Sequence, residues 1–118
     1  MWTKRIHYLT EVSELSDYLK KVNNFTDCII SSFSFYSENK LLYLTIEEDK
    51  SSSDFTNSSS LLWDLKCEGV SDFLMKDMGG LSKWWLHALY FEDNYFYFHL
   101  LDGYFSFKVT DFKLGIPY

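Results

Sequence analysis

Proline is almost absent from this 118-residue chain, whose single proline is Pro117, next to the C-terminus. No internal segment is therefore barred from a helix or strand by a missing backbone N–H. The two cysteines, Cys28 and Cys67, are too few for the disulfide framework of a small secreted protein. The first residues lack the apolar core of a signal peptide, and no stretch approaches a membrane span. These absences predict a cytoplasmic protein that does not associate with a membrane.

Basic residues are also scarce, with 11 Lys and Arg against 17 Asp and Glu, giving a net charge of −6. Contacts to phosphate need clustered Lys and Arg, so nucleic acid is not the expected partner. An acidic protein meets a basic protein partner faster, because opposite charges attract during encounter. The same charge also keeps an aromatic-rich domain soluble, and composition alone leaves both interpretations open.

Apolar residues are abundant, at 47% of the chain, and aromatic residues reach 20%. Intrinsic disorder of the whole chain is not expected at this composition. A chain of this length favours one domain, because it buries enough surface to hold a core of its own. We expect a single domain over residues 1–118.

Periodicity predicts one helix followed by strands. A helix is expected over about 11–22, where apolar residues recur at helical spacing: Val12, Leu15, Tyr18, Leu19 and Val22. The spacing then changes to two, and Ile29, Phe33 and Phe35 are expected to face the core. Similar alternation recurs in LLWDLKCEGV, KWWLHALYFE, YFYFHLL and YFSFKVTDF. The predicted fold is α+β: one N-terminal helix and a mostly antiparallel, curved, meander-like sheet of about six strands.

Two segments predict connections between strands. Residues 49–60 are rich in serine and are expected to form a flexible exposed loop. Phe55 within it either anchors a partner or packs back onto the domain. SDFLMKDMGG, residues 71–80, predicts a connection with a helical turn and a break at its two glycines.

No set of side chains predicts catalysis, and we expect no catalytic residue, no cofactor and no metal. Asp27 beside Cys28 would raise the pKa of the thiol, whereas a nucleophilic cysteine needs a lowered one. His87 and His99 fall on successive strands and with Glu92 or Asp93 would form at most an incidental metal site, since no paired-ligand motif occurs. Catalytic serine and phosphate-loop motifs are absent too.

What remains is a surface on which acidic groups border aromatic strands. Tyrosine and tryptophan with acidic neighbours suit the capture of a basic protein. The predicted partner-binding residues are Glu47, Glu48, Asp49, Asp54, Phe55, Glu92, Asp93 and Tyr95. The opposing interpretation is that the rings belong to the core and the acids only confer solubility.

Several positions carry a resemblance to a known group of proteins. FTDCIISSFSFYSENKLLYLTI begins with Phe-x-Asp-Cys at Phe25, continues through two alternating strands, and is followed by LWDLKCEGV with its Gly69-Val70 pair. The aromatic hairpin YFYFHLLDGYFSFKV completes the pattern. Over residues 25 to about 112 the chain resembles small bacterial immunity proteins of contact-dependent growth inhibition and polymorphic toxin systems. The N-terminal helix and the serine-rich loop are not part of that pattern.

The resemblance implies a non-catalytic protein that binds and neutralises the C-terminal domain of a cognate toxin, with a nuclease as the expected toxin class. We expect a monomer or weak homodimer. Two other functions stay open at this point. One is a small-ligand binder or enzyme with a pocket in the curved sheet. The other is a structural subunit that assembles with copies of itself through exposed aromatic strands.

Overall fold

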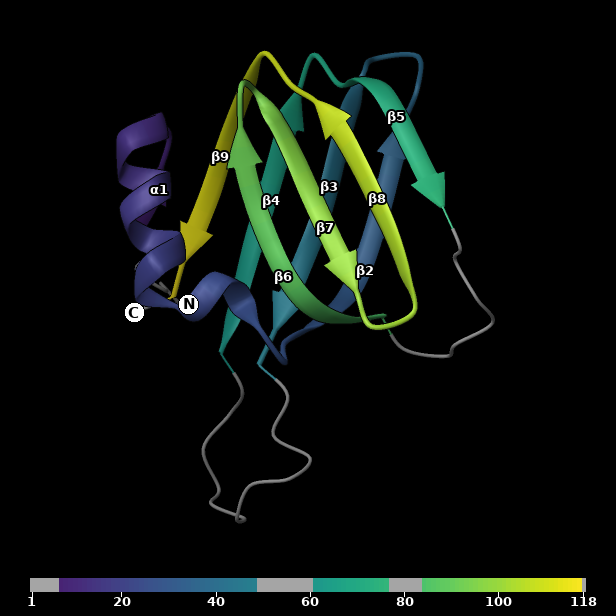
Figure 1. Cartoon of the computed structure of the whole chain (residues 1–118). Coiled ribbons are helices and arrows are strands. Elements are labelled where there is room, and N and C mark those ends of the chain that lie inside the picture. The colour runs from purple at the N-terminus through teal and green to yellow at the C-terminus, as the bar shows by residue number, and fades with distance from the viewer. Residues whose placement is uncertain (1–6, 49–60, 77–83, 118) are drawn as a thin grey trace, which may run out of the picture.

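The structure is a computed structural model that describes residues 7–48, 61–76 and 84–117. Its described strands form one sheet of nine, in the order β1-β9-β4-β3-β2-β6-β7-β8-β5, and every pair is antiparallel. The strands are β1 (His7–Leu9), β2 (Ile29–Tyr36), β3 (Leu41–Glu47), β4 (Leu62–Glu68), β5 (Ser71–Lys76), β6 (Trp84–Glu92), β7 (Tyr95–Leu100), β8 (Gly103–Lys108) and β9 (Asp111–Ile116). Helix α1 (Val12–Lys21) lies at one side of the sheet, next to β9 (Figure 1).

The predicted class, a mostly antiparallel sheet with one helix, is confirmed for the described residues, but the strand number of about six is wrong. Three further strands, β1, β5 and β9, account for the difference. β1 precedes the helix, and β9 separates from β8 because the chain turns at Val109 and Thr110. β5 occupies the segment that was expected to be a connection with a helical turn. Its register shifts between Ser71 and Leu74, where Asp72 has φ +52°, and this irregularity hides the alternation in the sequence.

The sheet consists of two meanders that face each other. β2, β3 and β4 form one layer, and β6, β7 and β8 form the other (Figure 1). The layers join where the start of β2 pairs with β6, Ile29 opposite Trp85 and Ile30 opposite Trp84. β9 returns to pair with β4, and β5 crosses to pair with β8, so the prediction of a meander holds within each layer and not across the whole sheet.

Helix α1 agrees with the predicted span of about 11–22. Its stripe buries Leu15 and Leu19, and Lys20 and Lys21 in the last turn complement the negative end of the helix dipole. A short turn, η1 (Asn23–Phe25), follows, in which all three residues have positive φ. Asparagine tolerates this conformation better than most residues, which explains why the helix ends there.

One inward-facing residue of β2 was predicted wrongly. Ile30, not Ile29, is buried with the core, because the strand has a bulge between Ile30 and Ser32. After the bulge Phe33, opposite Leu44, packs against the core as expected, whereas Phe35, opposite Leu42, is 37% exposed, so the prediction that it faces the core is only partly met. A bulge adds one residue to one strand, so the residues before it point to the opposite face from the one that a strict period of two predicts.

Phenylalanine rings fill the space between the two layers. Phe96, Phe98, Phe105 and Phe107 are fully buried, and the Phe98 and Phe105 rings stack with their centroids 4.5 Å apart. From the opposite layer, Phe33 packs edge-on against Phe105 at 5.5 Å. This packed interior is a poor place for the substrate pocket that the enzyme alternative requires.

Within the described ranges, no helix has both the length and the apolar character needed to cross a bilayer.

Candidate partner-binding surface

The continuous aromatic runs of β7 and β8 divide by residue type between the two faces of their layer. The four phenylalanines point into the core, while Tyr95, Tyr97 and Tyr104 lie on the outer face and are partly exposed. The difference is physical: a phenyl ring has no polar atom, whereas a phenol oxygen needs water or a hydrogen-bond partner. The sequence did not decide whether the aromatic rings of these strands lie in the core or at the surface. In the structure the face that carries the phenylalanines is buried and the face that carries the tyrosines is partly exposed to solvent.

These rings form one surface, which we call the tyrosine face: Tyr90, Tyr95, Tyr97, His99 and Tyr104. Tyr90 and Tyr97 are direct cross-strand partners, as are His99 and Tyr104. The His99 ring lies 5.6 Å from that of Tyr90 and 5.0 Å from that of Tyr104. Tyr90 is 48% exposed, a large value for a residue in the middle of a strand. Aromatic side chains held in this way have little conformational entropy to lose when a partner covers them.

Tyr95 connects the tyrosine face to a group of carboxylates. Its hydroxyl donates a 2.6 Å hydrogen bond to Asp72 Oδ2 on β5. This hydrogen bond, with the negative charge of Asp72, raises the pKa of Tyr95 above its ordinary value. On the other side, Lys108 Nζ lies 6.0 Å from the centre of the Tyr95 ring. The predicted site residue Tyr95 is thus held in place by neighbours of both charges.

Acidic side chains gather at the end of the molecule where β6 meets β7. We call this the acidic end, and its exposed carboxylates are Glu38, Glu68, Asp72, Glu92, Asp93 and Asp111, accompanied by the ammonium groups of Lys40, Lys66 and Lys108. The connections β2–β3, β4–β5, β6–β7 and β8–β9 all lie there, at the top of Figure 1. The tyrosine face begins at this end, because Tyr95 is the cross-strand partner of Glu92.

Backbone hydrogen bonds hold the connections of the acidic end together. Val109 N–H donates to Asn94 O at 2.9 Å, and Thr110 N–H donates to Glu68 O at 2.9 Å. The β6–β7 turn is a two-residue turn in which Asp93 and Asn94 have φ of +54° and +69°. These positive values fit the tight hairpin turn that matches the twist of a sheet.

The predicted acidic residues do not form one cluster. Glu92, Asp93 and Tyr95 lie together at the acidic end, whereas Glu47 pairs with Ile29, which also pairs with Trp85 at the start of β6. Glu47 is therefore roughly 23 Å from Glu92 along the sheet, at a rise of about 3.3 Å per residue.

Glu48 has a structural contact at that opposite end. Its carboxylate accepts a hydrogen bond from Leu61 N–H at 3.4 Å, and its own N–H donates to Leu61 O at 3.0 Å. The remaining predicted residues, Asp49, Asp54 and Phe55, lie outside the described residues, as does the serine-rich loop expected over 49–60.

Sequence reasoning did not predict Tyr90, Tyr97, His99 and Tyr104 as partner-binding residues. For Tyr97 and Tyr104 the available signal was the alternation of phenylalanine with tyrosine or serine in YFYF and YFSF. This alternation has a period of two, so it places the phenol groups on one face of the strands. Which of the two faces points to solvent depends on the layer that covers the other face.

The candidate reactive groups contribute to packing. Cys67 is fully buried on β4, and burial strongly raises the pKa of its thiol. Cys28 is half-buried and packs against the core just before β2. His87 and His99 are exposed on neighbouring strands, and the described residues contain no cluster of three or more metal-ligating side chains.

Comparisons with protein-family models, with curated proteins and with solved structures return no match to this chain. The resemblance to immunity proteins therefore stays a prediction. The positions that carry it have structural roles here: Phe25 and Val70 are buried at 0% and 2% exposure, and Gly69 has φ +66°.

Proposed function

We propose that this protein is an immunity protein, which neutralises a cognate bacterial toxin domain in the cytoplasm by binding it tightly and without catalysis. The observation that carries the proposal is the tyrosine face, an exposed aromatic surface that begins at the acidic end. Binding hot spots are enriched in tyrosine, and a charged rim beside them directs encounter.

Charge favours a basic partner. At the acidic end, carboxylates outnumber ammonium groups, and the whole chain has a net charge of −6. A toxin domain that acts on nucleic acid carries clustered Lys and Arg for its phosphate contacts. Such a domain is attracted to this end, and its cationic surface is neutralised on binding. We therefore infer that the partner is a nuclease-type toxin domain encoded next to this chain.

The tyrosine face supplies the apolar part of such an interface. Tyr90 and Tyr97 lie near the middle of their strands on the outer face of the β6–β8 layer. Their neighbours His99 and Tyr104 extend this surface away from the acidic end. Covering these rings removes apolar area from water, while the phenol groups keep their ability to form hydrogen bonds with a partner.

Growth rescue tests the proposal. The chain is expressed together with the variable C-terminal domain of the secreted protein encoded upstream, and colony formation is counted. The unaltered chain is expected to restore growth. Tyr97→Ala combined with Glu92→Lys is expected to weaken binding by about thirtyfold or more and so to reduce rescue, since truncation of a hot spot alone removes about 2 kcal/mol or more of binding energy.

The matched control places the same types of change elsewhere. Tyr43→Ala on the other layer and Asp17→Lys on α1 alter exposed residues that belong neither to the tyrosine face nor to the acidic end. This control variant should rescue growth as well as the unaltered chain. Failure of the unaltered chain to rescue would reject the function, and equal loss in both variants would reject the surface.

A further inference from the structure

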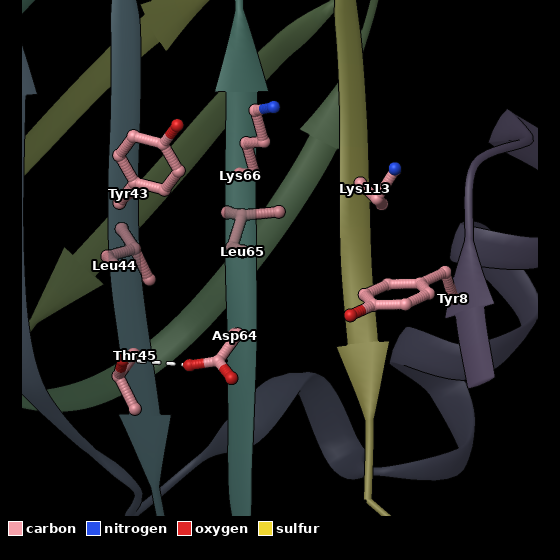
Figure 2. A pocket seen from close by; sticks show the side chains of 8 residues that line it. All are labelled: Tyr8, Tyr43, Leu44, Thr45, Asp64, Leu65, Lys66 and Lys113. Carbon is pink, nitrogen blue, oxygen red and sulfur yellow. Dashed lines mark hydrogen bonds between the residues drawn. The ribbon is translucent and has the colours of Figure 1, made fainter. Parts of the chain in front are cut away.

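A hollow of about 320 Å³ lies on the outer face of the other layer, away from the tyrosine face. β1, β9, β4 and β3 line it side by side (Figure 2). Leu44 and Leu65 form its floor, and the exposed side chains around it are Tyr8, Tyr43, Thr45, Asp64, Lys66 and Lys113. Its volume is within the range of small-molecule sites, which begins at about 300 Å³.

Two lysines face each other across neighbouring strands in this hollow. Lys66 on β4 is the direct cross-strand partner of Lys113 on β9. Side chains paired in this way have Cβ atoms about 5 Å apart, and like charges at such positions destabilise a sheet. A bound anion between the two ammonium groups would remove this repulsion.

A tyrosine ring lies near each of the two ammonium groups. Lys66 Nζ lies 5.9 Å from the centre of the Tyr43 ring, and Lys113 Nζ lies 5.3 Å from the centre of the Tyr8 ring. In Figure 2 the Tyr8 ring extends from β1 across β9, toward the middle of the hollow. The hollow therefore presents flat apolar surfaces beside both positive charges.

The carboxylates near the lysines have partners of their own. Asp64 Oδ1 accepts a 3.0 Å hydrogen bond from the Thr45 hydroxyl. Glu68 lies 3.5 Å from Lys66 Nζ, in a pair whose side chains are 38% and 50% exposed. Exposed pairs of this kind contribute little, so Lys66 can exchange Glu68 for a ligand at small cost.

We propose that this hollow binds a small phosphorylated molecule with a flat ring, of the nucleoside monophosphate type. The phosphate lies between Lys66 and Lys113, because lysine binds phosphate as a compact point charge. The ring packs against Tyr8 or Tyr43. Asp64, at the other side of the hollow, opposes the anion and limits its affinity. This site is separate from the tyrosine face and does not depend on the toxin.

Calorimetric titration with AMP tests the site. We expect saturable binding with a Kd below about 1 mM. Lys66→Gln and Lys113→Gln should each weaken binding by about tenfold or more. Asp64→Asn should tighten it severalfold, since the change removes a negative charge and keeps an oxygen that accepts from Thr45. A gain of affinity cannot result from a damaged fold.

The matched control is Lys108→Gln. Lys108 also lies over a tyrosine ring, that of Tyr95, but on the other layer. Its loss should leave AMP binding unchanged. Adenosine and inorganic phosphate should each bind about tenfold more weakly than AMP, since each lacks one half of the ligand. The proposal is overturned if AMP shows no saturable binding, if Lys108→Gln weakens it as much as Lys66→Gln, or if either half binds as tightly as AMP.

Discussion

Gly69 joins β4 to β5 at the acidic end in a conformation that suits glycine alone. Its φ is +66°, and a Cβ atom placed there would lie 2.6 Å from Thr110 Cγ2. Thr110 cannot easily move away, because its hydroxyl donates to Glu68 O at 3.1 Å and its N–H donates to the same oxygen. Gly69 thus allows the β4–β5 and β8–β9 connections to approach each other closely.

Gly69→Ala is expected to lower the free energy of unfolding by about 2–4 kcal/mol. The left-handed conformation accounts for about 1–2 kcal/mol of this loss, and the overlap with Thr110 accounts for the rest. Urea unfolding measures the loss. In a Thr110→Ala background the two closest atoms, Oγ1 and Cγ2, are gone and only the Cβ of residue 110, 2.9 Å away, stays close. Gly69→Ala should therefore cost less there, close to the conformational part. Strictly additive losses would show that the contact with Thr110 is not the cause.

At the scale of elements, α1 is attached to the sheet through a small aromatic cluster. Trp63 Nε1–H on β4 donates a 2.7 Å hydrogen bond to the Tyr18 hydroxyl. Phe25 lies between them, with its ring 4.9 Å from Trp63 and 6.3 Å from Tyr18. Burial raises the pKa of Tyr18, and the hydrogen bond from Trp63 lowers it by less.

Tyr18→Phe is expected to lower the free energy of unfolding by about 1–2 kcal/mol at neutral pH, because the Trp63 N–H loses its acceptor. The difference in unfolding free energy between the unaltered protein and Tyr18→Phe should become smaller in alkaline solution. A raised folded-state pKa means that the contribution of Tyr18 is complete below about pH 10 and is lost as the pH rises through the folded pKa. Urea unfolding of both proteins at several pH values measures this. A difference that stays constant with pH would contradict it.

Local patterns predicted the elements whose partners are close in the sequence. The helix over 12–21 and the hairpins β2–β3 and β6–β7 follow from periodicity and turn residues. β5 and the inward face at Ile30 were missed, since a bulge depends on the partner strand and leaves no regular mark in one sequence.

The surface residues divide in the same way: local patterns predicted some of them, and the others depend on contacts between distant segments. Glu92, Asp93 and Tyr95 were found because a turn brings them together within four residues. The pairing of Lys66 with Lys113 depends on β9 returning to β4, a contact between segments about fifty residues apart, which no local pattern encodes.

At the scale of the whole molecule, the two outer faces differ in chemistry. The layer β6–β8 exposes the tyrosine face beside the acidic end, whereas the other layer, with β9 beside β4, exposes Tyr43 together with the lysine pair of the hollow. A partner that is both basic and large is therefore expected on the first layer and not on the second. The central claim is that a basic toxin domain binds at the acidic end and the tyrosine face.

The association rate of the purified chain with the upstream toxin domain, measured by stopped flow from about 50 mM to about 500 mM salt, tests this claim most directly. We expect a tight one-to-one complex whose association rate falls by about tenfold or more over this range. Glu92→Lys combined with Asp93→Lys should reduce both the rate at low salt and its dependence on salt. The absence of a complex, or an association rate that salt and this variant leave unchanged, would contradict the account.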